Sequence, residues 1–351
     1  MKRFFAVGLM LSIILVVQAK IATPYTQKSS PAQLSGEDVT LIAEAYHLQK
    51  SLGGRLWMGW AETQIPILYV TRDFEYALGF PENAKGFQSL NSNDILPGVK
   101  IQVRQRVLEP TLAAARDVDG VNAVVIGSPA NLGKSPSRWV LIAVHEMFHV
   151  WQFSKGSTAK VRELNIGSPS DASWQVNFPF PYNNADLMRL IHLQSYLIYL
   201  AATNVELSDA KYNAGTALEA VEVYRNVLKQ LDASDQFYKY SKFQEWDEGI
   251  AFYTEYKLAE LAASADYQPS AAFRQLDGFQ SYRQLWDDTY KNRIFLAKHA
   301  GRIARSRTTF YQLGLGKGLL LDRLMPDWKS RYFASGIWLD DLLTEALSKS
   351  E

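Results

Sequence analysis

The spacing of hydrophobic residues changes along the chain, from strand-like runs in its first third to helix-like periodicity afterwards. Short apolar or alternating runs bounded by glycine, proline and polar residues predict strands at 65–71, around 99–103 and at 121–126. From Ser137 onward, apolar residues recur every three or four positions, as they do on a buried helix face. The pattern therefore predicts an α+β chain in which a small mixed sheet precedes a mainly α-helical part.

Helix boundaries follow from capping residues and from glycine and proline. Ser35, followed by Glu37 and Asp38, resembles a capping box and predicts a helix from there to about position 51, ended by Gly53 and Gly54. Residues 155–184 are rich in glycine and proline, so we expect a long loop there. The remaining predicted helices are 138–153, 185–203, 209–231, 245–263, 282–305, 313–324 and 339–347.

The first residues have the layout of an export signal. Lys2 and Arg3 precede an apolar run at 4–17, and small residues lie before an expected cut after Ala19. The run is shorter than the ~20 residues of a membrane-spanning helix. We therefore expect a signal peptide at 1–19 and an exported protein, periplasmic or secreted, without a stable membrane span. An uncleaved anchor is the alternative.

Composition narrows the class of protein. The chain has 351 residues, is 47% hydrophobic and carries a formal net charge of +1. The apolar fraction excludes wholesale disorder, and the near-neutral charge argues against a nucleic-acid partner. After a loose leader at 20–34, we expect an N-terminal lobe at 35–153 and a helical C-terminal lobe at 154–351. The chain has no cysteine and five histidines, so any metal site must use histidines and carboxylates.

The candidate chemistry lies in His145-Glu146-Met147-Phe148-His149, an H-E-x-x-H sequence. Histidines four positions apart on a helix point to the same side and can bind one ion. Glu146 is offset around the axis, so it can reach a water at the metal without ligating the metal itself. We therefore predict that His145 and His149 bind Zn²⁺. The alternative is a chance match on a buried helix that carries core histidines.

A zinc site of this kind needs a third protein ligand and one open position. The segment that begins at Trp246-Asp247-Glu248-Gly249-Ile250-Ala251 resembles the N-E-G-x-A-x-x-x-E segment of gluzincins, the thermolysin and aminopeptidase branch of zinc peptidases. The resemblance covers two short motifs and implies a zincin-like fold with Glu248 as the third ligand. Glu245 and Asp247 are rival ligands. The chain between His149 and Glu248 is far longer than in the aminopeptidases.

The sequence also departs from thermolysin. Where thermolysin has an aspartate that orients the first histidine, this chain has Phe252, so the supporting carboxylate must come from elsewhere. Glu255 returns to the face of Glu248 and is the candidate; an exposed helix charge is the alternative. Tyr311 lies in a segment similar to one near the end of several gluzincin families and is a candidate donor to the oxyanion. Tyr253 and His192 are further options, although His192 has apolar neighbours typical of a core histidine.

These residues predict an exported zinc metallopeptidase that acts on a peptide or protein substrate. Glu146 is expected to take a proton from the zinc-bound water and to pass it to the leaving amine, while zinc polarises the substrate carbonyl. By analogy with the fold, the predicted strand at 121–126 would line the cleft and pair with an extended peptide. The alternative is a non-catalytic exported helical protein whose metal site is structural or vestigial.

Overall fold

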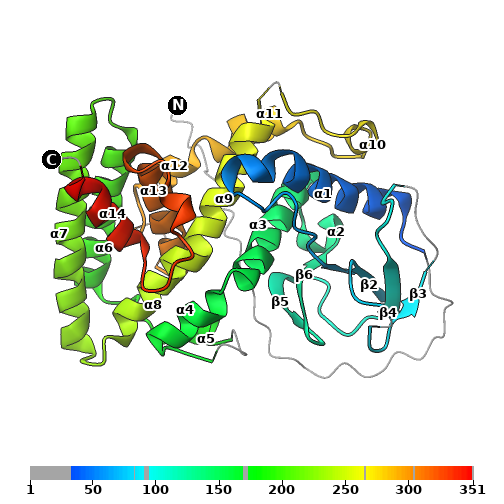
Figure 1. Cartoon of the computed structure of the whole chain (residues 1–351), viewed down its shortest axis with the longest axis horizontal. Helices are drawn as coiled ribbons and strands as arrows, with labels where there is room; N and C mark the ends of the chain where they lie inside the picture. Colours follow the sequence, from blue (N-terminus) through cyan, green and yellow to red (C-terminus); the bar gives the residue numbers. More distant parts are fainter. Residues whose placement is uncertain are drawn as a thin grey trace, which may run out of the picture.

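The computed structural model describes residues 33–82, 84–90, 95–168, 173–264, 266–302 and 305–349. The predicted signal peptide and residues 20–32 of the predicted leader lie outside this part of the chain. The α+β class is confirmed, because a mixed sheet in the first part of the chain is followed by a mainly helical part (Figure 1). None of the helices in the described ranges combines the length and the hydrophobicity needed to cross a bilayer.

The sheet has six strands in the order β3-β4-β2-β1-β6-β5. β1 and β6 run parallel, and the other neighbours are antiparallel. β5 lies at one edge and β3 at the other. The strands are Ile67–Val70 (β1), Phe74–Leu78 (β2), Gln88–Ser89 (β3), Ile101–Gln105 (β4), Ala113–Val118 (β5) and Val121–Gly127 (β6).

Both faces of the central strands are buried, in the two-residue alternation of a strand. Ile67 and Tyr69 face the main core, which they share with the long helices, whereas Leu68 and Val70 face a smaller apolar cluster that includes neighbouring loops. Helices α1 and α3 pack against each other and belong to the same main core as the first of these faces. The sheet therefore supports the helix that carries the H-E-x-x-H residues.

The remaining elements are helical. In chain order they are Gly36–Leu56 (α1), Pro129–Leu132 (α2), Pro136–Ser154 (α3), Ser157–Leu164 (α4), Ser173–Asn177 (α5), Ala185–Thr203 (α6), Leu207–Leu231 (α7), Gln236–Gln244 (α8), the π-helical turn Glu245–Gly249 (η1), Ile250–Ala262 (α9), Ala271–Arg274 (α10), Tyr282–Leu285 (α11), the π-helical turn Trp286–Tyr290 (η2), Arg293–Ala297 (α12), Thr308–Leu324 (α13), the 3₁₀ turn Trp328–Ser330 (η3) and Leu339–Ser348 (α14).

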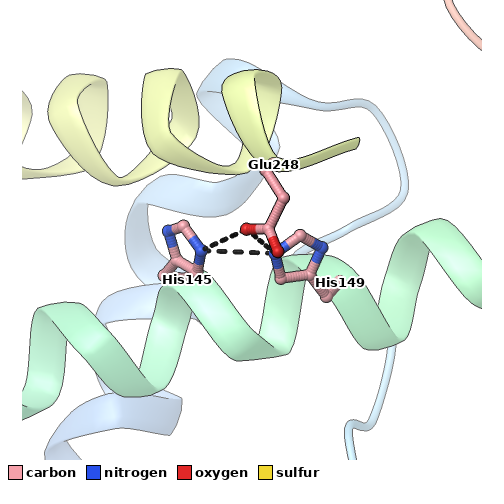
Figure 2. A group of neighbouring side chains, drawn as sticks. All are labelled: His145, His149 and Glu248. Atoms are coloured by element: carbon pink, nitrogen blue, oxygen red, sulfur yellow. Dashed lines mark hydrogen bonds and ion pairs between the residues drawn. The ribbon is translucent and has the colours of Figure 1, made fainter. Parts of the chain in front are cut away.

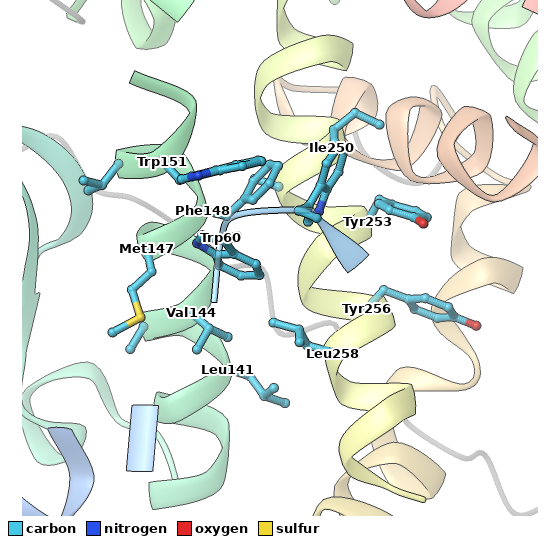
Figure 3. Packing of buried hydrophobic residues seen from close by; sticks show 14 of the residues in the cluster. Trp60, Leu141, Val144, Met147, Phe148, Trp151, Ile250, Tyr253, Tyr256 and Leu258 are labelled. Atoms are coloured by element: carbon cyan, nitrogen blue, oxygen red, sulfur yellow. The ribbon is translucent and has the colours of Figure 1, made fainter. Parts of the chain in front are cut away.

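The sheet and the helical part meet along α3 and α9. These helices cross the middle of the molecule, with the sheet beyond α3 and helices α6 and α7 at the far end of the helical part (Figure 1). Their facing sides are apolar: Phe148 and Trp151 come from α3, and Ile250 and Tyr253 come from α9 (Figure 3). Trp57 adds a ring 5.0 Å from that of Phe148. This aromatic contact joins α3, which carries the two histidines, to α9, which begins directly after the turn of Glu248.

Several local predictions were wrong. Helix α1 does not end at Gly53 and Gly54 but continues to Leu56, and a Cβ on Gly53 would lie 3.1 Å from the Trp60 ring. The first glycine therefore serves packing rather than termination. The predicted loop at 155–184 contains α4 and α5, and the single helix predicted at 282–305 is broken into α11, η2 and α12 within its described residues.

Candidate metal centre

Helix α3 holds His145, Glu146 and His149 in the interior. Ser135 caps its N-terminus by accepting a hydrogen bond from the backbone of Arg138, and Pro136 occupies the first turn, where no backbone donor is needed. The three side chains belong to residues that are only 6–8% exposed. Ionisable groups are costly in such a place unless partners compensate them. The contacts of these three residues therefore define what the site can do.

Glu248 approaches the histidines from the π-helical turn η1. Its Oε2 atom lies 3.2 Å from His149 Nε2 and 3.8 Å from His145 Nε2, and the two Nε2 atoms are 3.2 Å apart (Figure 2). π-helical turns are rare and occur frequently at functional sites, because the wider turn redirects side chains. Two nitrogens from one helix and one oxygen from another thus converge on one point, and His145, His149 and Glu248 could together hold a metal ion.

The rival ligands have other partners. Glu245 accepts a hydrogen bond of 2.5 Å from Lys317, which is itself buried and also contacts Asp340. Asp247 lies on the other side of the His149 ring, with its Oδ1 atom 3.8 Å from Nδ1. The structure therefore brings Glu248, and not Glu245 or Asp247, to the Nε2 atoms.

His145 is backed by Glu255, whose Oε2 atom lies 3.1 Å from His145 Nδ1. Arg138 and Arg293 form ion pairs with the other oxygen of Glu255, and the Tyr290 hydroxyl donates to it at 2.5 Å. Burial alone would raise the pKa of Glu255, but the two arginines outweigh burial and hold it far below its usual range. An anion beside Nδ1 favours the tautomer with the proton on Nδ1, which leaves the Nε2 lone pair for a metal.

His149 is backed by a neutral side chain. Its Nδ1 atom lies 2.7 Å from Gln152 Oε1, and the Gln152 amide nitrogen donates to the backbone oxygen of Asp247 and to the Tyr332 hydroxyl. The Tyr332 hydroxyl in turn donates to the backbone oxygen of Trp246. This network fixes the orientation of the amide, so its oxygen faces His149. Both histidines therefore have a partner at Nδ1 and direct Nε2 toward Glu248.

Glu146 lies beside the edge strand β5. Burial raises the pKa of Glu146, the charges of His145 and His149 oppose the rise, and a backbone hydrogen bond from Ala115 of β5 also lowers it. The strand predicted to line a cleft was β6, but β6 is paired on both sides, with β1 and β5, and has no free edge. The unpaired edge next to Glu146 belongs to β5, where Ala113, Ala114 and Ala115 are half-buried.

Tyr311 lies at the site, but its hydroxyl forms a hydrogen bond with the carboxylate of Glu248. Burial raises the pKa of Tyr311 well above its usual value, and the charge of Glu248 and a hydrogen bond to that carboxylate raise it further. One turn before it, Arg307 Nη1 lies 3.1 Å from Glu248 Oε1. Although burial alone would raise the pKa of Glu248, Arg307 and His149 lower it well below its usual value. The role of Tyr311 toward an oxyanion remains a prediction.

A glycine pair brings α13, the helix of Tyr311, against the turn of Glu248. A Cβ on Gly249 would lie 2.6 Å from the Gly314 Cα atom, and a Cβ on Gly314 would lie 2.3 Å from the backbone oxygen of Glu245. Real Cβ atoms do not come so close, so both positions require glycine. Gly249 therefore allows α13 to approach the turn that carries the third proposed ligand.

The other predicted candidates lie elsewhere. The Tyr253 hydroxyl donates to Asp322 at 2.7 Å. His192 is half-buried and its ring stacks on that of His299, with centroids 5.7 Å apart. The His192 ring also has a hydrogen bond with the backbone of Ala300, so its interpretation as a core histidine stays a prediction. Neither residue belongs to the cluster formed by Glu248 and the histidines of α3.

Glu255 was expected to support the first histidine, but the other groups around the three ligands were not predicted. Gln152 lies three positions after His149 and Arg138 seven positions before His145, so helical periodicity on α3 was a signal that could have indicated both. Arg293 and Arg307 come from segments far along the chain. No local pattern places them near α3.

The donor set fits a divalent metal. Two imidazoles protonated on Nδ1 and one carboxylate would direct three electron-rich atoms at the same buried point, an arrangement that a cation neutralises. Nitrogen and oxygen donors of this kind suit Zn²⁺. Compared with known proteins, the chain matches no family model, no curated protein and no solved structure, so its chemistry has to be inferred from the site itself.

Proposed function

We propose that the protein is a zinc-dependent metallopeptidase. The observation that carries the proposal is the convergence of His145 Nε2, His149 Nε2 and Glu248 Oε2 within 3.2–3.8 Å of one another, with Glu146 one residue from the first histidine. Three protein ligands leave a tetrahedral ion one further position, as in catalytic rather than structural zinc sites. A Zn²⁺ ion held by these residues would polarise a peptide carbonyl and make a water more acidic.

Glu146 is the proposed general base. Burial raises the pKa of its carboxyl, which brings its basicity closer to neutral pH than that of an exposed glutamate. It neighbours both histidines on α3 but is not one of the three converging groups. In the proposed reaction Glu146 takes a proton from the attacking water and gives it to the leaving amine. Tyr311 would help stabilise the oxyanion if its hydroxyl turned away from Glu248.

The edge strand β5 supports a peptide as substrate. An extended chain can add to an unpaired strand edge by backbone hydrogen bonds, and the small side chains of Ala113, Ala114 and Ala115 leave room beside it. The contact between Ala115 and Glu146 places this edge next to the proposed base. A peptide bound along β5 would therefore pass the group that acts on it.

The proposal includes a zincin-like fold and export. The zincin-like fold is supported by the edge strand beside the H-E-x-x-H helix and by a third ligand from the second part of the chain. Export is supported by the charged and apolar pattern at 1–19. Expression of the full chain in a bacterium, followed by fractionation and mass determination of the mature N-terminus, tests export and the cut after Ala19. A protein retained in the cytoplasm with Met1 intact would contradict both.

Metal analysis and a peptide-library digest test the activity. The purified protein is expected to contain one Zn²⁺ per chain and to cleave peptides, and a chelator should abolish cleavage reversibly. The variant E146Q is expected to keep the zinc and to lose cleavage by several orders of magnitude, since removing a general base costs roughly 10²–10⁴-fold. Glu219→Gln, at an exposed glutamate of α7, is the control and should retain activity.

Two results would contradict the proposal. If the wild-type protein does not bind zinc stoichiometrically, the assignment of His145, His149 and Glu248 as ligands is wrong. If zinc binds but no peptide is cleaved, or E146Q cleaves as fast as the wild type, the site is not that of a peptidase. Zinc binding without any cleavage would favour the non-catalytic alternative with a structural metal.

A further inference from the structure

Arg307 contacts the proposed third ligand from the side opposite the histidines. It precedes the first turn of α13, and its side chain is only 16% exposed. Its Nη1 atom lies 3.1 Å from Glu248 Oε1, and its guanidinium carbon lies 5.4 Å from the centroid of the Tyr311 ring. The ring below and the carboxylate beside it hold the guanidinium in one place.

The two oxygens of Glu248 therefore have different partners. Oε2 faces the Nε2 atoms of His145 and His149, as Figure 2 shows, whereas Oε1 is paired with Arg307. A free carboxylate can ligate a cation through one oxygen or both. Pairing one oxygen with a cationic side chain opposes ligation through both, because the ion and the guanidinium would then compete for the same lone pairs.

We propose that Arg307 is a positioning residue that limits Glu248 to one oxygen on the metal. The inference rests on the proposed metal site and adds to it how the site keeps a position free for water. A second Glu248 oxygen on the ion would occupy the place that hydrolysis requires. Arg307 does not contribute to metal affinity in this arrangement, because a cation beside a ligand repels the ion it binds.

The position of Arg307 depends on the packing of α13. The close approach of Gly314 to Gly249 sets the distance between α13 and η1, and with it the position of Arg307 beside Glu248. The histidines have their own partners at Nδ1, Glu255 and Gln152. Replacing Arg307 therefore leaves the partners of both histidines in place and removes only its own contacts with Glu248 and with the Tyr311 ring.

The test compares wild type, R307Q and R307K as zinc and as cobalt(II) proteins. R307Q is expected to bind zinc at least as tightly as the wild type in competition with a chelator. Its cobalt(II) form should show weaker visible absorption bands, typical of a higher coordination number. Its kcat for peptide cleavage should fall roughly 10- to 100-fold with KM little changed, the range seen when an outer-shell partner is lost. R307K, which keeps the charge, should recover part of the absorption and of kcat.

Arg323→Gln is the matched control, since Arg323 lies at the other end of α13 and donates to the backbone oxygens of Ala201 and Val205. It should leave the cobalt spectrum and kcat unchanged. An unchanged cobalt spectrum in R307Q, whether or not zinc affinity falls, would overturn the proposal and leave Arg307 a structural support. Absence of stoichiometric metal in the wild type would overturn the proposed function as well, so the two failures are distinguishable.

Discussion

The Nε2 atoms of His145 and His149 lie 3.2 Å apart, with one oxygen of Glu248 close to both. In the metal-free protein this arrangement keeps the two histidines protonated at higher pH than free histidine. Burial would lower the pKa of His145, but Glu248 and Glu255 outweigh burial and raise it to about 10. Burial would also lower the pKa of His149, and Glu248 outweighs it there as well. At pH 7 the metal-free site therefore carries protons that a metal ion must displace.

Zinc binding at pH 7 is consequently expected to release protons. The apparent affinity should rise with pH up to about 10, by roughly tenfold per pH unit for each proton displaced. Calorimetric titration with zinc in buffers of different ionisation enthalpy measures the number released. A binding enthalpy that does not depend on the buffer would contradict the prediction.

The same protons make the free energy of unfolding of the metal-free protein depend on pH, in a direction that follows from the pKa of His145. The pKa of His145 is about 10 in the folded state and 6.5 in the unfolded chain. The folded state thus binds more protons between these values, so the stabilisation is complete below pH 6.5 and is lost as the pH rises toward 10. Urea unfolding of the metal-free protein at pH 6.5 and pH 9 should show this loss. H145Q should weaken the trend, whereas a variant of the exposed His47, H47Q, should retain it.

Gln152 is expected to support zinc binding through His149. The variant Q152L removes the acceptor at Nδ1 and should raise the dissociation constant for zinc roughly 10- to 100-fold, as loss of an outer-shell partner does in other sites. Gln49→Leu is the control: Gln49 is equally buried and donates to the backbone oxygens of Trp60 and Thr63, away from the metal. Equal loss of zinc affinity in both variants would indicate a general loss of stability.

Gly314 is expected to be intolerant of even one methyl group. In G314A the Cβ atom would lie 2.3 Å from the backbone oxygen of Glu245 and 2.5 Å from the Gly249 Cα atom, so α13 and η1 must separate. Overpacking of this kind costs about 1–3 kcal/mol in the free energy of unfolding, and separation should also weaken zinc binding. Chemical denaturation and chelator competition measure the two effects.

Gly215 of α7 provides the opposite case, because a Cβ there meets no atom within 4 Å. G215A should raise the free energy of unfolding by about 0.5–1 kcal/mol, since alanine favours a helix interior over glycine. If G314A and G215A have the same effect, the close contact of Gly314 with η1 is not what constrains that position.

Glu255 is expected to stabilise the fold as well as the site. In E255Q, Arg138 and Arg293 keep their charges in the interior without a counter-ion, which costs about 3–5 kcal/mol for a buried pair. The folded-state pKa of Glu255 lies below the unfolded value of 4.5, so its stabilisation is present above pH 4.5 and declines as the pH falls through the folded value. The difference between wild type and E255Q should thus shrink below pH 4.5.

Urea unfolding at pH 7 and at pH 3.5 measures this difference. Glu44→Gln is the control, since Glu44 is fully buried but accepts hydrogen bonds from the Tyr267 hydroxyl and from the backbone of Ser270 rather than from arginine. A loss in E255Q no larger than that in E44Q would show that the arginines do not need the charge.

Local pattern was sufficient for the helix of the site and insufficient for the strand beside it. The apolar run before His145 predicted α3, because every face of that helix is buried. Residues 113–118, in contrast, begin with three alanines and continue with charges, a composition that favours a helix. They form β5 only because β6 offers a strand to pair with. Tertiary context thus overrides propensity at the edge strand.

The candidate ligands could be found from motif spacing, but their supports depend on the fold. Glu248 was chosen over Glu245 and Asp247 by resemblance, and the π-helical turn that separates their directions has no signature in the sequence. Arg307 reaches Glu248 only because α13 packs against η1 through Gly314. The glycines of α13 suggested no function in the sequence, and in the structure they are contact points between helices.

A metal held by His145, His149 and Glu248 would also act as a cross-link. His149 and Glu248 are 99 positions apart, and they belong to the two sides of the aromatic contact between α3 and α9. A tie across so long a loop restricts the unfolded chain and opposes the separation of α9 from α3. Chelation would thus remove one of the links between the sheet and the helical part, leaving the aromatic contact of α3 and α9, and we expect the chain between these helices to become more open to proteolysis.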